Sequence, residues 1–184
     1  MSSRAPLPTM RVLQTFAAND FPSEWPYTAD DLSRMDESPD FNFYSAPRFV
    51  THIDDGAIAA ITQYYRESLK EGSDCLDICS SWISHLPKEK KLGRVVALGM
   101  NARELEANER ATEYVLRDLN VEPILPFDDN SFDAVLNVVS VDYLNRPKEV
   151  FAEMHRVLRP GGQAIMSFSN RCFPTKAVSM WLAQ

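Results

Sequence analysis

Short, largely apolar runs recur along the chain and predict strands buried in a sheet. These runs lie at residues 75–79, 94–98, 132–139 and 164–169, with a shorter run at residues 113–116. Most of the segments between them carry hydrophobic residues at helical spacing. This alternation predicts an α/β fold with a mostly parallel, Rossmann-like sheet of about five strands and with helices on both faces.

Two segments show the clearest helical pattern. In the first, Asp54 and Asp55 offer an N-cap, Gly72 offers a stop, and apolar residues recur on one face at Ile58, Ile61, Tyr65 and Leu69. In the second, Pro160-Gly161-Gly162 ends the pattern, and the apolar face comprises Val150, Phe151, Met154, Val157 and Leu158. Each helix has one apolar face, so each is expected to cover the sheet.

Three further helices are predicted from local signals. Asn101 with Glu104 three positions later predicts a helix that starts with a capping box. Another helix is expected directly after Ser81, between the first two strands, and a last one begins near Lys176. The connection between residues 116 and 132 carries prolines instead of a helical pattern.

The chain divides into an arm and one domain. Residues 1–43 are rich in proline and aromatic residues, so an irregular N-terminal arm is expected there, with a short helix near Ala29–Met35. Residues 44–184 form the α/β domain.

Composition narrows the classes of function. The 184 residues carry a formal net charge of -7, which disfavours nucleic acid as a partner. No apolar run approaches the roughly 20 residues of a membrane helix, so no membrane partner is expected. Three cysteines without a C-x-x-C pair indicate neither a disulfide framework nor a metal site. A reducing compartment, the cytoplasm or an organelle interior, is expected rather than secretion.

Ligands of open parallel sheets bind beyond the carboxyl ends of the strands. The loops at these ends are residues 79–85, 99–101, 117–120 and 137–143. Small Ser80 and Ser81 let backbone N–H groups approach a carboxylate or phosphate, and Asp118 could accept a hydrogen bond from an adenine amino group or a ribose hydroxyl. Ordinary strand-end turns explain each of these residues about as well.

Residues 124–170 read ILPFDDNSFDAVLNVVSVDYLNRPKEVFAEMHRVLRPGGQAIMSFSN. The stretch LPF-x-D-N-S-F-D, the apolar strand after it and the turn E-x-H-R-V-L-R-P-G-G occur in order and at fitting distances. This combination resembles the methyltransferase type 11 group of class I methyltransferases, which depend on S-adenosylmethionine (SAM). With Asp77 and Asp118 included, the resemblance covers roughly residues 73–170, which makes residues 44–184 a methyltransferase-like domain.

The resemblance implies SAM as the cofactor, but two of its elements are altered. The glycine-rich loop after the first strand reads Cys79, Ser81 and Ile83, and Gly99 stands where an acid normally binds the ribose. Asp77 and Asp118 match the acids of the first and third strands. The implied cofactor-binding residues are Asp77, Cys79, Ser80, Ser81, Met100, Asn101, Asp118, Leu119 and Asn137.

The resemblance also implies a small-molecule methyl acceptor. If the acceptor loses a proton, a general base is needed, and Asp142, Tyr143 and His52 are the candidates. The altered loop leaves a second hypothesis open, a methyltransferase-like binding or regulatory protein without turnover. A dinucleotide-dependent oxidoreductase is a weaker alternative, because no G-x-G-x-x-G follows the first strand.

Family members usually add two strands after the helix that is expected near Lys176. The domain is therefore expected to lack this C-terminal strand pair and to be truncated at its C-terminus, as a fragment or variant of a longer protein. Strand 164–169 would then lie at an open edge, which invites self-association.

Overall fold

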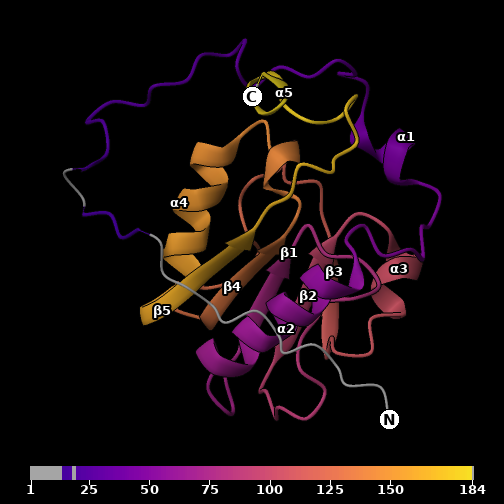
Figure 1. Cartoon of the computed structure of the whole chain (residues 1–184), viewed down its shortest axis with the longest axis vertical. Coiled ribbons are helices and arrows are strands. Elements are labelled where there is room, and N and C mark those ends of the chain that lie inside the picture. Colours follow the sequence, from indigo (N-terminus) through magenta and orange to yellow (C-terminus); the bar gives the residue numbers. More distant parts are fainter. Residues whose placement is uncertain (1–13, 18–19, 184) are drawn as a thin grey trace.

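The computed structural model describes residues 14–17 and 20–183, and within them the predicted parallel sheet is confirmed (Figure 1). Five strands lie in the order β3-β2-β1-β4-β5, and every neighbouring pair is parallel. The strands are β1 (Cys75–Ile78), β2 (Val95–Gly99), β3 (Glu113–Leu116), β4 (Phe132–Val138) and β5 (Leu158–Ser167). Because β1 is central, the loop after it lies between the ends of β2 and β4.

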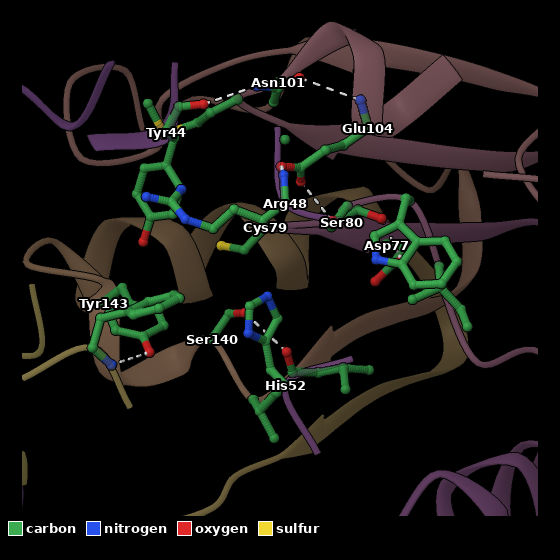
Figure 2. A pocket seen from close by; sticks show the side chains of 18 of the residues that line it. Tyr44, Arg48, His52, Asp77, Cys79, Ser80, Asn101, Glu104, Ser140 and Tyr143 are labelled. Carbon is green, nitrogen blue, oxygen red and sulfur yellow. Dashed lines mark hydrogen bonds between the residues drawn. The ribbon is translucent and has the colours of Figure 1, made fainter. Parts of the chain in front are cut away.

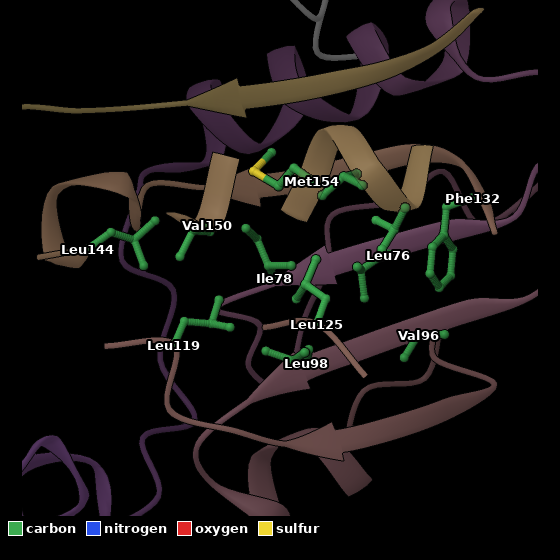
Figure 3. Packing of buried hydrophobic residues seen from close by; sticks show 12 residues of the cluster. Leu76, Ile78, Val96, Leu98, Leu119, Leu125, Phe132, Leu144, Val150 and Met154 are labelled. Atoms are coloured by element: carbon green, nitrogen blue, oxygen red, sulfur yellow. The ribbon is translucent and has the colours of Figure 1, made fainter. Parts of the chain in front are cut away.

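Helices α2 (Asp55–Ser68) and α4 (Pro147–Val157) bury opposite faces of the central strands. Leu76 and Ile78 of β1 pack in the cluster that contains the α4 residues Val150, Met154 and Val157 (Figure 3). Cys75, one position away on β1, packs with Tyr65 of α2. Each buried Leu, Ile or Val side chain stabilises the fold by roughly 1.5–3 kcal/mol.

The predicted N-caps of two helices are confirmed, with one difference. Asp54 caps α2 by accepting the N–H of Ala57, and Asn101 caps α3 (Ala102–Glu106) by accepting the N–H groups of Arg103 and Glu104. The reciprocal half of the expected capping box is absent, because the carboxylate of Glu104 binds other groups.

The helix expected after Ser81 does not form, and residues 79–94 connect β1 to β2 without one. The hydroxyls of Ser80 and Ser84 donate to the buried carboxylate of Asp77 instead. His85 then takes a φ of 54° and Pro87 follows, so local polar bonds and backbone geometry interrupt any helical turn.

Strand β5 starts earlier than predicted. Its first residue, Leu158, pairs with Phe132, and the ladder resumes where Gln163 pairs with Ala134. Between them the Pro-Gly-Gly turn bulges out, with Gly161 at a φ of 80°. Among the described residues, β4 is the strand that pairs with β5. Self-association through the other edge stays a prediction.

The described part of the arm is irregular as predicted, but its helix was misplaced. Residues 29–35 form turns, because Asp31 accepts hydrogen bonds from Thr28 and Ser33 donates to the carbonyl of Asp30. The helix of the arm is α1 (Asp40–Tyr44). Residues 1–13 and 18–19 of the expected arm lie outside the described residues.

Buried ion pairs hold the arm against the C-terminal segment. Lys176 is completely buried, and its Nζ lies 3.1 Å from carboxylate oxygens of both Asp36 and Asp40. Arg34 donates to Asp40 across 2.7 Å, and its backbone forms an isolated antiparallel bridge with Val178. The helix expected near Lys176 is reduced to the short α5 (Ser179–Leu182).

None of the described helices is long and apolar enough to pass through a membrane.

Candidate functional site

The carboxyl ends of β1 to β4, the segment 40–53 and the segment 171–173 line a cavity of about 280 Å³ (Figure 2). The predicted site residues that line it are His52, Asp77, Cys79, Ser80, Ser81, Met100, Asn101, Asp118, Leu119 and Tyr143. The carboxyl ends of the strands thus converge as the sheet topology requires. Two predicted residues, Asn137 and Asp142, do not line the cavity.

Asp77 anchors the loop after β1. Its carboxylate is buried and accepts hydroxyl hydrogens from Ser80 and Ser84 at 2.7 and 2.6 Å. Burial raises the pKa of Asp77 to about 6, and the two serine hydroxyls offset part of that rise. The loop is therefore held down by side-chain bonds to Asp77.

The ends of β1 and β4 are both in the left-handed region. Cys79 has a φ of 53° and Val139 a φ of 43°, although neither is glycine. Such conformations cost about 1–3 kcal/mol each and are found mostly where surrounding contacts hold a functional loop. Burial also raises the pKa of Cys79 to about 12, so this thiol is not an activated nucleophile.

Gly99 lets the loop after β1 approach the end of β2. A Cβ on Gly99 would lie 2.2 Å from the carbonyl oxygen of Ser80. Close packing against Ser80 therefore explains why glycine, and not the expected ribose-binding acid, stands at this position. Met100 and Asn101 follow it along the cavity, but the amide nitrogen of Asn101 is bound to the carbonyls of Tyr44 and Ser45.

Glu104, in the first turn of α3, places a carboxylate near the position where the family acid after β2 is missing. Its Oε1 accepts the backbone N–H of Arg48 at 2.6 Å, and its Oε2 accepts the hydroxyl of Ser81 at 2.6 Å. Each carboxylate oxygen can accept a second hydrogen bond. Glu104 therefore joins three segments and keeps accepting capacity toward the cavity.

After β3, Asp118 and the buried Leu119 line the cavity as predicted. Asp118 Oδ1 accepts the N–H of Asn120 at 2.9 Å, so it is also a turn residue. Burial raises the pKa of Asp118, and the bond from Asn120 opposes that rise. Both interpretations of Asp118 remain compatible with the geometry.

Asn137 and Asp142 are buried and do not line the cavity, so their contact with a ligand stays a prediction. Asn137 is fully buried at the end of β4, and its amide donates to the carbonyl of Ile78 at 3.5 Å. Asp142, in the 3₁₀ turn Val141–Tyr143, is buried, which raises its pKa to about 6. Both side chains are turned toward the protein interior.

The opposite side of the cavity is aromatic. Phe173 lies 5.2 Å from Phe43, 5.4 Å from His52 and 5.9 Å from Tyr143, measured between ring centroids. Tyr44 completes this group, at 4.9 Å from Phe43, and these five residues are here named the aromatic cluster. The hydroxyl of Tyr143 accepts the N–H of Phe173 at 2.8 Å and so fixes the segment after β5.

Sequence reasoning missed that segment, residues 171–173, and missed Asp40 as a lining residue, whereas Asn120 belongs to the predicted loop 117–120. The rule that ligands bind at strand ends applies equally to β5, and it would have found the segment. Asp40, in the N-terminal arm, carries no comparable signal. Among the described residues, no group of three or more His, Cys, Asp or Glu is placed to hold a metal ion.

The parallel sheet, with a cavity at the carboxyl ends of its strands, defines a Rossmann-like ligand-binding domain. The family model described as "Methyltransferase domain" matches residues 76–166. This part of the chain is therefore similar to the methyltransferase domain of class I, SAM-dependent enzymes.

One curated relative and two solved structures are similar to this chain, and the solved structures share its fold. Demethylmenaquinone methyltransferase of Staphylococcus carnosus is 35% identical over 109 residues, which are 53% of this chain and 43% of that protein. The [4+2]-cyclase SpnF superposes with a TM-score of 0.52 and 18% identity, over 74% of this chain and 60% of the other. Phosphoethanolamine N-methyltransferase 2 of Haemonchus contortus, solved with SAM, superposes with a TM-score of 0.51 and 21% identity, over 62% of this chain and 28% of the other. The chain spans less than half the length of the curated relative.

Proposed function

We propose that this chain binds SAM in the cavity at the strand ends and transfers its methyl group to a small-molecule acceptor. The observation that carries the proposal is the convergence of Asp77, Glu104 and Asp118 on one cavity, from β1, from helix α3 after β2, and from the end of β3. The family of residues 76–166 supports SAM as the cofactor, and the demethylmenaquinone methyltransferases among the relatives support a small-molecule acceptor.

The cavity residues fit SAM in two respects. Ser80 and Ser81 are small, and Gly99 allows their backbone to lie close against β2, so the loop does not fill the ligand space. Carboxylates face the cavity where a nucleoside and a positively charged sulfur would be attracted. Asp118 would face the adenine or ribose from the end of β3.

Glu104 would take over the ribose hydroxyls from the acid that Gly99 replaces. Its carboxylate lines the cavity three positions after Asn101, and both of its oxygens keep a free accepting position. A charge-assisted hydrogen bond contributes roughly 1.5–3 kcal/mol, which is about tenfold or more in affinity.

SAM, when bound, supplies an electrophilic methyl group on a sulfur that leaves as a neutral thioether. The aromatic cluster of the chain would align the acceptor and exclude water from it. His52 lines the cavity, and neither of its ring nitrogens is bonded to another described residue. Burial lowers the pKa of His52, so its ring is neutral at pH 7 and can accept a proton from an acceptor hydroxyl.

The test is calorimetric titration of the chain with SAM, its demethylated product S-adenosylhomocysteine, and NAD. Micromolar binding of SAM with no binding of NAD is the expected result. A folded chain that binds neither SAM nor its product would contradict the proposal. That outcome would favour the second candidate, a binding protein without turnover, for which the loop without glycine and the missing helix at residues 79–94 are the supporting observations.

A further inference from the structure

Arg48 is a cation held inside the cavity without an acidic partner. Of the arginines that line the described cavity, Arg117 pairs with Glu122 at 2.8 Å and Arg171 is exposed at the rim. The guanidinium of Arg48 has no carboxylate within 4.0 Å among the described residues. In a chain with a formal net charge of -7, such a position is unusual and needs a reason.

The aromatic cluster fixes this guanidinium in place. Its central carbon lies 4.5 Å from the ring centroid of Phe43, 5.6 Å from Phe173 and 5.9 Å from Tyr44. One of its nitrogens donates to the carbonyl of Phe43 at 2.8 Å. A guanidinium has five N–H donors, so most of them remain free for a ligand. The contacts with the rings orient the group but leave its charge uncompensated.

The walls around Arg48 suit a flat molecule. Tyr44, Tyr143, His52 and Phe173 all line the cavity and present rings to it. Ring faces and edges bind planar aromatic molecules through stacked or edge-to-face contacts. A planar fork of N–H donors matches a carboxylate or another flat oxyanion with two parallel hydrogen bonds.

From this geometry we infer that Arg48 and the aromatic cluster form an acceptor subsite for a planar aromatic anion, an aryl carboxylate or a phenolate. The inference rests on the proposed function only in naming this ligand the acceptor. Arg48 would bind the ionised oxygen, and Phe173, Tyr143 and His52 would contact the ring. Because this acceptor is already ionised, its methylation would need no proton transfer, and His52 would serve there as a wall of the subsite.

The test uses benzoate and its neutral analogue benzamide as probes, followed by the NMR signals of the chain. Benzoate should bind at least about tenfold more tightly than benzamide and should perturb the signals of His52, Tyr143 and Phe173. Arg48→Gln should abolish the preference for benzoate. Arg103→Gln, which removes an equal charge from exposed α3 outside the cavity, should keep it.

Parallel titrations separate this inference from the alternatives. S-adenosylhomocysteine carries a carboxylate, and 5′-methylthioadenosine lacks it. If Arg48→Gln weakens the first ligand but not the second, Arg48 binds the cofactor carboxylate and the inference is overturned. Equal binding of benzoate and benzamide by the wild-type chain also overturns it.

Two further outcomes keep the two proposals distinct. Benzoate binding through Arg48 in a chain that binds no S-adenosylhomocysteine would retain the subsite and reject the proposed function. If Arg48→Gln does not fold, Arg48→Lys keeps the charge without the planar fork, and it should retain part of the preference for benzoate. Complete retention of the wild-type preference by Arg48→Lys, or its complete loss, would count against the inference.

Discussion

Ser84 donates its hydroxyl hydrogen to Oδ2 of Asp77 across 2.6 Å, and both side chains are buried. This bond closes the loop after β1 in place of the helix that the sequence pattern predicted. It also makes Asp77 a group whose protonation is coupled to folding, because burial raises its pKa from 3.8 to about 6.

The first prediction concerns the pH dependence of stability. Between about pH 4 and pH 6 the folded chain binds more protons at Asp77 than the unfolded chain does. The stabilisation from this group is therefore present below pH 4 and is lost as the pH rises through about 6. Asp77→Asn should remove this contribution. As the pH rises from 4 to 7, the free energy of unfolding of the variant should therefore fall less than that of the wild type, with a difference of about 3 kcal/mol at most.

Urea denaturation of both chains from pH 4 to pH 7 measures this difference. The Ser84 hydroxyl lowers the pKa of Asp77, so Ser84→Ala should move the window to higher pH. Identical pH profiles for the wild type and Asp77→Asn would show that Asp77 does not titrate in this range.

The second prediction separates the two interpretations of Asp118. Asp118→Ala should weaken SAM binding by about tenfold and reduce the free energy of unfolding by about 1 kcal/mol, because the bond to the N–H of Asn120 is lost. Asp54→Ala is the matched control, since it also removes a carboxylate that accepts a backbone N–H, but outside the main cavity. It should reduce stability by a similar amount and leave SAM affinity unchanged. Unchanged SAM affinity in Asp118→Ala would make Asp118 a turn residue alone.

The third prediction concerns Gly99. A methyl group there would lie 2.2 Å from the carbonyl oxygen of Ser80, so the loop after β1 would have to move. Gly99→Ala should reduce the free energy of unfolding by about 3 kcal/mol and abolish SAM binding. Gly161→Ala has open space around its new methyl group and a φ of 80°, so it should lose only about 1 kcal/mol. Urea denaturation and calorimetry measure both effects, and equal losses in the two variants would contradict the packing role of Gly99.

The fourth prediction concerns the ion pairs that hold the arm. Lys176→Met should reduce the free energy of unfolding by about 3 kcal/mol, because Asp36 and Asp40 lose a buried cation. Lys88→Met removes an exposed partner of Glu109 and should change it by less than about 1 kcal/mol. Guanidinium denaturation of the two variants provides the comparison, and a negligible loss for Lys176→Met would show that the pairing is not a source of stability.

The fifth prediction tests the charges around His52. Burial lowers the pKa of His52, Arg48 lowers it further, and Glu104 raises it. Arg48→Gln should therefore raise this pKa, and Glu104→Gln should lower it. Burial alone lowers the pKa of His85, which should stay constant in both variants and serves as the internal control. NMR titration of the imidazole signals measures all of these values, and an unmoved His52 signal would mean that the three side chains are not neighbours in solution.

The sheet was predictable because buried parallel strands leave a strong local signal. The apolar runs at β1, β2 and β4 have little polar interruption, and their order along the chain leaves few topologies. The carboxyl-end rule then placed Ser80, Ser81 and Asp118 on one cavity without knowledge of any relative, and the family resemblance added Asp77. The family resemblance supplied the identity of the cofactor.

The errors came from side-chain bonds that periodicity does not record. The bonds from Ser80 and Ser84 to Asp77 displaced a helix, and the bonds of Glu104 to Arg48 and Ser81 replaced half of a capping box. Asn137 and Asp142 were expected to contact a ligand because they are polar and follow an apolar strand. Both are buried and do not line the cavity, and polarity alone does not report burial.

The place of β1 in the sheet determines when the cavity can exist during folding. Asp77 pairs with Ala97 on one side and with Leu136 on the other, and the second pairing joins residues that are far more distant along the chain. Closing so long a stretch of chain is slow, and many other contacts can precede it. A chain that has not yet joined β4 to β1 lacks part of the cavity floor, so we expect SAM binding during refolding to report that β4 has paired with β1.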